Sequence, residues 1–256
     1  AVVGDESRGF FGLQFHPEVT HSVRGREIIE NFLSRVCEAP ADWRPGSIVE
    51  REIEKVHTLV GETGEIVLGL SGGVDSSVAA VILQKAVGER LHCVFVDNGL
   101  LRHGERQAVE DLFGGHFHMD LTVVDAREEF LGALAGISDP EQKRKVIGKV
   151  FVDVFRREAT RFSNAKFLGQ GTLYPDVIES IPAHGGATHV IKSHHNVGGL
   201  PEDLDMELVE PLRELFKDEV REIGRHLGLA SAVVDRQPFP GPGLAVRILG
   251  DITEAK

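Results

Sequence analysis

The residues best suited to chemistry form one short run, Leu-Ser-Gly-Gly-Val-Asp-Ser-Ser at 70–77. It follows an apolar segment at 66–70 and precedes another at 78–83, an order that predicts a strand, a glycine turn and a helix start. The unpaired N–H groups and positive dipole end of a helix start attract anions, and glycines let the backbone approach them closely. We therefore expect phosphate or pyrophosphate here. The residues of this glycine loop are Ser71, Gly72, Gly73, Val74, Asp75, Ser76 and Ser77.

The composition of the glycine loop limits the kinds of binding site that it can form. An ordinary strand-to-helix turn, the alternative, needs only glycine or one cap rather than a run of small polar and acidic residues. No lysine follows the glycines, so the loop is not of the Walker type, and it lacks the Gly-x-Gly-x-x-Gly spacing of dinucleotide-binding turns. The hydroxyls of Ser71, Ser76 and Ser77 can donate to phosphate oxygens. Asp75 is best explained as a Mg²⁺ contact, because the cation would offset repulsion between its carboxylate and phosphate.

A second polar group, Asp97-Asn98-Gly99, follows the apolar segment 91–96, which is a predicted strand. Ligands of open parallel sheets bind in the crevice at strand carboxyl ends. This placement puts Asp97 and Asn98 near adenine or ribose if the glycine loop takes the phosphates. An Asn-Gly turn explains Asn98 and Gly99 equally well, so both interpretations stay open.

A third group lies between residues 169 and 200. Asp176 and Glu179 are three residues apart, a spacing that puts both on one face of a helical turn, where they could hold Mg²⁺. Lys192 and the paired histidines His194 and His195 offer positive or donor groups for phosphate. Zinc binding by the histidine pair is disfavoured, because adjacent residues point to different faces and no cysteine is near.

The flexible stretch 184–187, His-Gly-Gly-Ala, separates the acidic pair from the lysine and histidines. We expect this region to form a lid over the glycine loop. A lid that brings cations over a triphosphate would also exclude water from a reactive adenylate.

Lys217 and Asp218 begin a predicted helix at 217–227, whose inward stripe is Val220, Ile223 and Leu227. A solvated charged face explains the other charged residues of this helix. At a helix start that follows a Pro-kinked strand, however, Lys217 and Asp218 are expected near the same carboxyl-end crevice.

His16 and Glu18 stand two apart after the apolar segment 10–15. In an extended chain such residues point to one side, so Glu18 could orient His16 as a general base. A surface turn that happens to contain both residues is the alternative.

These groups need a scaffold, and the chain predicts one. From residue 66 onward strand-like and helix-like segments alternate, which is typical of an α/β fold: a doubly wound, mostly parallel sheet with helices on both faces. Residues 1–36 hold one strand and one helix, too few partners for a core of their own. The predicted strands are 10–15, 66–70, 91–96, 121–124 and 166–168, and the predicted helices are 26–36, 78–83 and its flanks, 105–113, 127–134, 140–162 and, as the last, 217–227.

Composition excludes several classes of protein. The 256 residues are 41% hydrophobic, enough for a substantial core, and the formal charge of −12 argues against a broad nucleic-acid surface. Cys37 and Cys93 form no CxxC pair, which favours a reduced, cytoplasmic setting without a disulfide or structural zinc. No apolar stretch approaches the ~20 residues that span a membrane, and no signal peptide is recognised.

Two segments resemble known families. The glycine loop resembles the signature loop of the N-type ATP pyrophosphatases, which cut ATP between the α and β phosphates and adenylylate a substrate oxygen. The segment 12–19, Gly-Leu-Gln-Phe-His-Pro-Glu-Val, resembles the end of a class I glutamine amidotransferase domain, where His and Glu complete a triad with an upstream cysteine. Cys37 and Cys93 do not match that cysteine, so the chain as given is not expected to hydrolyse glutamine.

Six segments in order resemble the glutamine-hydrolysing GMP synthase family: 16–21, 70–77, 96–102, 170–180, 191–201 and 238–244. The resemblance implies amination of xanthosine monophosphate to GMP. ATP and Mg²⁺ would form an adenylylated intermediate, AMP and pyrophosphate would be released, and ammonia would come from glutamine in a complete homodimeric enzyme. It also implies an amidotransferase remnant at 1–37, a linker at 38–46, an ATP pyrophosphatase domain at 47–236 and the start of a dimerisation domain at 237–256.

The same resemblance implies roles for individual residues. The implied catalytic residues are His16, Glu18, Lys192, Lys217 and Asp218; the implied nucleotide-binding residues are those of the glycine loop with Asp97, His194 and, more weakly, Arg144; the implied metal contacts are Asp75, Asp176 and Glu179. Two other functions remain open. A tRNA-thiolating pyrophosphatase shares the loop but needs a nearby nucleophilic cysteine and a basic surface, and a non-catalytic subunit would bind ATP without releasing pyrophosphate.

Overall fold

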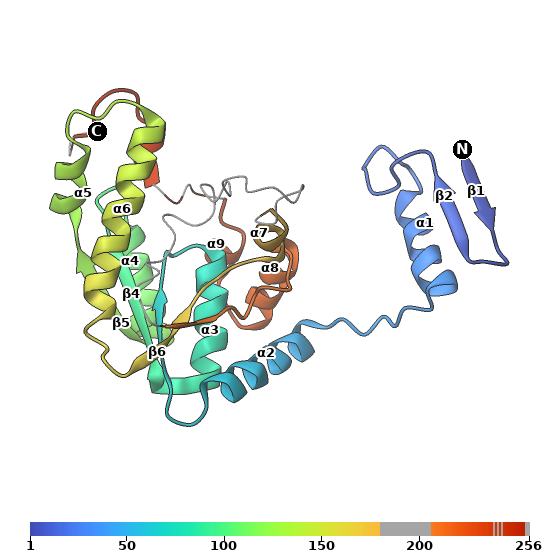
Figure 1. Ribbon diagram of the computed structural model, residues 1–256, viewed down its shortest axis with the longest axis horizontal. Coiled ribbons are helices and arrows are strands. Elements are labelled where there is room, and N and C mark those ends of the chain that lie inside the picture. Colours follow the sequence, from blue (N-terminus) through green and yellow to red (C-terminus); the bar gives the residue numbers. More distant parts are fainter. Residues whose placement is uncertain (180–205, 238, 240, 242, 254–256) are drawn as a thin grey trace. The chain divides into compact units, whose positions relative to one another are not determined.

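The structure is a computed structural model that describes residues 1–179, 206–237, 239, 241 and 243–253. The chain divides into two compact units, Ala1–Arg44 and Pro45–Lys256 (Figure 1). The expected lid, with Lys192 and both paired histidines, lies outside the described residues.

The first unit is a hairpin followed by a helix. Strand β1 (Val2–Asp5) pairs antiparallel with β2 (Phe10–Leu13), and α1 (Gly25–Asn31) continues into the π-helical segment η1 (Phe32–Val36). The predicted strand and helix are confirmed, although β2 is shorter than expected and β1 was not predicted. Within residues 1–44 only Gly25 is buried, which confirms that this unit lacks a core of its own.

The second unit is built on a five-stranded sheet in which every pairing is parallel. Its strand order, β5-β4-β3-β6-β7, confirms the predicted α/β fold, and four of its strands were predicted from the sequence. The short strand β7 corresponds to the Pro-kinked strand expected before Lys217, whose bounds were not predicted. The strands are β3 (Glu65–Gly69), β4 (Leu91–Asp97), β5 (Asp120–Asp125), β6 (Ala165–Gly169) and β7 (Glu207–Val209).

Helices cover both faces of this sheet (Figure 1). On one face α2, α3 and α8 pack against one another, and on the other α5 packs against α6. Each face has its own buried apolar cluster, so the expectation of helices on both faces is confirmed. The bounds are α2 (Pro45–Val60), α3 (Val74–Val87), α5 (Arg127–Leu134), α6 (Pro140–Ala159) and α8 (Lys217–His226).

Shorter helices complete the unit, and those that follow residue 227 correct one expectation. Helix α2 was not predicted, and its first residues fall inside the predicted linker 38–46. The predicted helix at 217–227 is not the last, because a short helix and a 3-10 turn follow it. These elements are α4 (Glu105–Val109) with η3 (Glu110–His116), η2 (Gly88–Arg90), α7 (Tyr174–Glu179), α9 (Ser231–Val234) and η4 (Gly243–Arg247).

Lys143 on α6 holds the last described segment of the chain in place. Its side chain is fully buried, and its ammonium group donates to the backbone oxygens of Ala245 (3.4 Å), Ile248 (2.7 Å) and Gly250 (2.6 Å). A buried ammonium needs such partners, and these carbonyls lie where the 3-10 turn η4 ends. The contact therefore anchors η4 to α6.

The strand order places a switch point between β3 and β6. Strands β4 and β5 extend the sheet on one side of β3, whereas β6 and β7 extend it on the other. In sheets with such a switch point, the loops that leave the two strands diverge, and ligands bind outside the carboxyl ends of these strands. None of the described helices is long and apolar enough to cross a membrane.

Candidate active site

The glycine loop lies at this switch point, between the end of β3 and the start of α3. Gly72 has φ +70°, a left-handed conformation in which residues that carry a side chain are strained. Gly73, the residue before the helix, is extended. The hydroxyls of Ser76 and Ser77 both donate to the Gly73 carbonyl, at 3.1 and 2.7 Å. These two hydroxyls shape the loop, which leaves the N–H groups of the first helical turn as the donors that we expect to bind an anion.

A second glycine segment closes over the helix start. A Cβ atom built on Gly171, just after β6, would lie 3.3–3.4 Å from the backbone of Asp75 and Ser76. A side chain at this position would be tightly packed against that backbone, so glycine favours the close approach of the two segments. The switch point is therefore walled by backbone from two strands, which suits a ligand with many acceptor oxygens.

Lys217, the first residue of α8, reaches the glycine loop. Its ammonium group lies 2.7 and 2.5 Å from the two carboxylate oxygens of Asp75, a residue 142 positions earlier. Both side chains are about one-third exposed. The helix that presents Lys217 begins with a capping interaction, in which the Phe216 N–H donates to Glu219 at 2.7 Å. The fold thus brings a cation and a carboxylate together beside the glycine loop.

The residues present are compatible with Mg²⁺ at Asp75. Among the residues that the structure describes, no group of three His, Cys, Asp or Glu side chains could hold a metal ion by itself. Mg²⁺ is usually held by one or two carboxylates together with substrate phosphates and waters. A single carboxylate beside a loop that is expected to hold phosphate fits that description.

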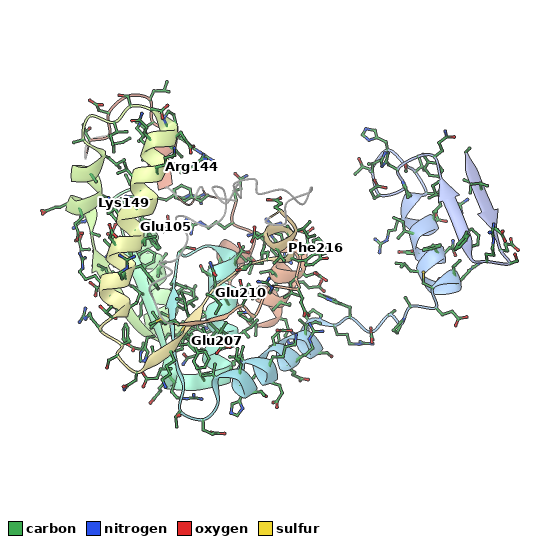
Figure 2. All side chains as sticks on the ribbon, in the orientation of Figure 1. Glu105, Arg144, Lys149, Glu207, Glu210 and Phe216 are labelled. Atoms are coloured by element: carbon green, nitrogen blue, oxygen red, sulfur yellow. The ribbon has the colours of Figure 1, made fainter. Side chains whose placement is uncertain are left out.

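Asp176 and Glu179 both lie on α7, the helical turn that was expected. The carboxylate of Asp176 accepts the Leu173 N–H at 2.9 Å, so it also stabilises the start of this helix. Glu210 follows β7 and accepts the Thr172 hydroxyl at 2.5 Å. Glu210 was not among the predicted site residues; Figure 2 marks it, together with Glu105 and Phe216.

Asp218 and Arg144 make other contacts. Asp218 is 95% exposed and pairs with Arg221 one turn later on α8. Arg144 pairs with Glu141 on α6, which covers the sheet face opposite α3. Of the predicted pair at the start of α8, the structure therefore brings Lys217, and not Asp218, to the glycine loop.

Asp97 and Asn98 are buried at the carboxyl end of β4. The Asp97 carboxylate accepts the Gly99 N–H at 3.1 Å, and the Asn98 side chain accepts the Leu100 N–H at 2.9 Å. These bonds build the turn that was the alternative interpretation. A pocket of about 210 Å³, lined in part by Asp97 and Arg106, opens beside it, so a nucleoside contact remains compatible with the turn.

Arg236 and Glu105 also contact the glycine loop, and sequence reasoning missed both. The Arg236 guanidinium donates to the Gly72 carbonyl at 3.0 Å and to the Glu105 carboxylate at 2.6 Å. Glu105 begins α4 and its side chain is only 4% exposed. Nothing local in the sequence links these residues, which come from distant segments.

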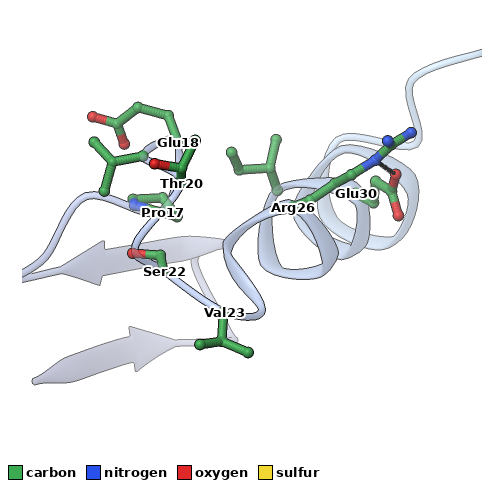
Figure 3. Close-up of a pocket in the computed structure, with 9 residues that line it drawn as sticks. Pro17, Glu18, Thr20, Ser22, Val23, Arg26 and Glu30 are labelled. Carbon is green, nitrogen blue, oxygen red and sulfur yellow. Dashed lines mark hydrogen bonds and ion pairs between the residues drawn. The ribbon is translucent and has the colours of Figure 1, made fainter.

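In the first unit the His16 Nδ1 atom lies 2.7 Å from the Glu18 carboxylate, in a turn after β2. Both side chains are mostly exposed, at 81% and 59%. A backbone hydrogen bond within Glu18, aided by His16, lowers the pKa of the Glu18 carboxyl. Glu18 also lines a pocket of about 520 Å³ beside α1 (Figure 3). Glu18 contacts His16 as expected. The two residues lie in an exposed turn, which is what the alternative interpretation predicts.

The two cysteines differ sharply in their exposure to solvent. Cys37 is exposed, whereas Cys93 is buried within β4. Burial, with a smaller effect of the Asp120 charge, raises the pKa of the Cys93 thiol to about 12. Cys93 is therefore protonated at neutral pH and unsuited to act as a nucleophile.

Comparison with known proteins agrees with this geometry. The NAD synthase family model matches residues 48–112, and the class-I glutamine amidotransferase family model matches residues 1–36. A solved structure of NMN synthetase from Francisella tularensis superposes with a TM-score of 0.59 and 17% identity, covering 79% of this chain and 78% of that one. At this identity the likeness shows the fold alone.

Other proteins are much more similar to this chain in sequence than that structure is. The chain is 57% identical over 252 residues to the glutamine-hydrolyzing GMP synthase of Shewanella woodyi and, equally, to that of Haemophilus influenzae strain PittEE. Each alignment covers 98% of this chain and 48% of the relative, so the chain spans about half the length of these curated relatives. By sequence, this chain belongs to the family of glutamine-hydrolysing GMP synthases.

Proposed function

We propose that the second unit catalyses the ATP-dependent amination of xanthosine monophosphate to GMP, through an adenylylated intermediate and with release of AMP and pyrophosphate. The observation that carries the proposal is the glycine loop at the switch point, with Lys217 and Asp75 joined beside it. The identity of 57% along almost the whole chain supports this choice of substrate over other reactions that release pyrophosphate.

The residues of the crevice would share this work. The N–H groups at the start of α3 would hold the departing pyrophosphate, and Lys217 would offset its charge as the bond to the α-phosphorus breaks. Mg²⁺, held by Asp75 with Asp176 or Glu179 as further candidates, would neutralise phosphate charge. Asp97 is proposed near the nucleoside, while Lys192 and His194 remain predicted phosphate contacts.

The first unit would take part in ammonia supply. We propose that residues 1–37 belong to an amidotransferase domain in which His16 and Glu18 serve a cysteine outside this chain. Residues 38–46 would link it to the pyrophosphatase domain at 47–236, and 237–256 would begin a dimerisation domain. A homodimer and a cytoplasmic location are part of the same proposal.

A chimera tests the proposal in a complete context. The aligned 252 residues of the Haemophilus influenzae relative would be replaced by those of this chain. With ATP, Mg²⁺, xanthosine monophosphate and ammonium, the chimera should release pyrophosphate and AMP and form GMP; the unaltered relative is the positive control. Release that requires tRNA in place of xanthosine monophosphate would contradict the assignment. ATP binding without any release would instead indicate a non-catalytic nucleotide-binding unit.

A further inference from the structure

The Gly72–Gly73 peptide is the part of the glycine loop most able to change its orientation. A peptide flip rotates ψ of the first residue and φ of the second by about half a turn, and side chains normally forbid one of the resulting conformations. Glycine on both sides removes that barrier. The same freedom that would let the loop approach an anion therefore leaves this peptide without an intrinsic preference for either orientation.

The direction of this peptide decides what the loop offers to an anion. The peptide is trans, so its C=O and N–H groups point in opposite directions. With the Gly72 carbonyl turned to Arg236, the Gly73 N–H points to the other side, toward the Ser71 hydroxyl at 3.4 Å. A flipped peptide would present a carbonyl oxygen there, which repels phosphate.

We propose that Arg236 is a positioning residue that locks the Gly72–Gly73 peptide in the orientation that binds pyrophosphate. Its guanidinium donates through one nitrogen to the Gly72 carbonyl and through the other to Glu105. A Cβ atom on Gly72 would lie 3.5 Å from the Glu105 carboxylate and 3.8 Å from the Arg236 guanidinium, so both side chains pack directly on this glycine. The planar fork of arginine suits two acceptors held at a fixed angle.

Glu105 is the second part of the lock. Its side chain is nearly fully buried, and its other carboxylate oxygen accepts the Arg102 N–H at 3.0 Å in the loop after β4. The Arg102 side chain in turn donates to the Gln237 carbonyl, next to Arg236. Because Glu105 neutralises Arg236, the arginine acts on the loop by geometry rather than by attracting phosphate itself. The lock also joins the glycine loop to the loop that carries Asp97.

The test measures pyrophosphate and nucleoside binding separately, on the full 256-residue chain. Calorimetry gives the affinity for Mg²⁺-pyrophosphate and for adenosine in the unaltered chain, Arg236→Ala, Arg236→Lys and Glu105→Gln. Arg225→Ala is the matched control, because it removes an exposed arginine paired with Asp235, beside Arg236. Thermal unfolding of each variant reports whether it folds.

We expect Arg236→Ala to weaken pyrophosphate binding roughly 10- to 100-fold, because a charge-assisted hydrogen bond is lost and the peptide is freed. Arg236→Lys and Glu105→Gln should weaken pyrophosphate binding by more than about twofold but by less than Arg236→Ala does, since each keeps only part of the fork. Adenosine affinity should change by less than about twofold in the two Arg236 variants, whose side chain does not line the pocket beside Asp97, as should both affinities in the control.

Pyrophosphate affinity within about twofold of the unaltered chain in folded Arg236→Lys and Glu105→Gln would overturn the proposal, whether or not Arg236→Ala folds. Equal losses for pyrophosphate and adenosine would also overturn it, because they indicate a general structural role. The inference rests on the proposed function only in that the glycine loop holds pyrophosphate. A chain that binds pyrophosphate but aminates no xanthosine monophosphate would refute the proposed function and leave this lock standing, whereas a chain that binds no pyrophosphate would refute the lock.

Discussion

The two units of this chain hold their chemically suggestive side chains in opposite ways. His16 and Glu18 meet across two residues of one exposed turn. Asp75 and Lys217 meet across 142 residues, at the meeting point of two helices that pack on one sheet face. The first unit buries a single glycine, whereas the second has an apolar cluster on each side of its sheet.

This difference teaches that the same kind of contact has different consequences in the two units. A contact between close neighbours forms wherever the turn forms, and solvent screens it. A contact between remote residues needs the sheet and both helices to be in place, and it is held more rigidly by them. Substitutions in the second unit should therefore have the larger effects.

The largest contrast is expected between the two thiols. At pH 8 the exposed Cys37 should react with a disulfide reagent on the order of 1,000-fold faster than Cys93, whose raised pKa of about 12 leaves almost no thiolate. The measurement is the time course of thiol release in native conditions and in guanidinium chloride, where both should react quickly. Two fast thiols in the native protein would mean that β4 is not buried as described.

Substitution at the glycine loop comes next. In the chimera Asp75→Asn should lower the rate of pyrophosphate release by roughly 100-fold or more, because the loop loses the carboxylate that pairs with Lys217 and is proposed to contact Mg²⁺. Asp153→Asn is the control, since Asp153 is an exposed partner of Arg156 on α6. Unchanged kinetics in Asp75→Asn would rule out a metal role for this residue.

Buried Lys143 should matter for stability rather than turnover. Lys143→Met leaves the carbonyls of Ala245, Ile248 and Gly250 without their donor and should lower the free energy of unfolding by about 2–4 kcal/mol. Urea unfolding measures the change, with Lys145→Met, at an exposed position on the same helix, as the control. Equal midpoints for the two variants would show that the ammonium group does not anchor η4.

The smallest effect concerns two glutamates with lowered pKa values. Hydrogen bonding to Arg161, and less strongly to Arg157, holds the pKa of Glu158 below its ordinary 4.5. A depressed carboxyl pKa adds stability above the unfolded pKa, and this stability is lost as pH falls toward the folded value. Glu158→Gln should therefore lower the free energy of unfolding by about 0.5–1 kcal/mol at pH 7.

The pH dependence separates the two units further. The difference between the Glu158→Gln variant and the unaltered chain should shrink as pH falls below 4.5. Glu18→Gln, at the exposed position in the first unit, should change stability very little at pH 7. A larger loss of stability for Glu18→Gln than for Glu158→Gln would reverse the contrast between the units.

Much of the fold could be predicted from local patterns. Helix α5 has the predicted bounds, β4 and α8 differ from prediction by one residue at one end, and β3 is shifted by one residue at both ends. Apolar periodicity and glycine placement report local conformation directly, which explains this success. Helix α2 was missed although its buried residues Ile48, Val56 and Val60 repeat at helical spacing, so the signal was present. The three-residue strand β7 offered too short a pattern.

The residues of the candidate site also divide into those that local sequence predicts and those that it does not. The glycine loop was predictable because a strand end, two glycines and a helix start are consecutive in the chain. Its partners were not equally predictable: Lys217 rested on a family resemblance, and Arg236 and Glu105 carried no signal. Asp218, predicted beside Lys217, makes its contact with Arg221 on the surface of α8.

The sequence by itself determined the conformation of the loop, because glycine freedom and helix initiation depend on a few neighbouring residues. Only the tertiary structure decided which remote side chains reach that loop. That choice follows from the strand order and from the face on which each helix packs. Periodicity in the chain cannot specify either one, since both arise when buried surfaces from distant segments pack together.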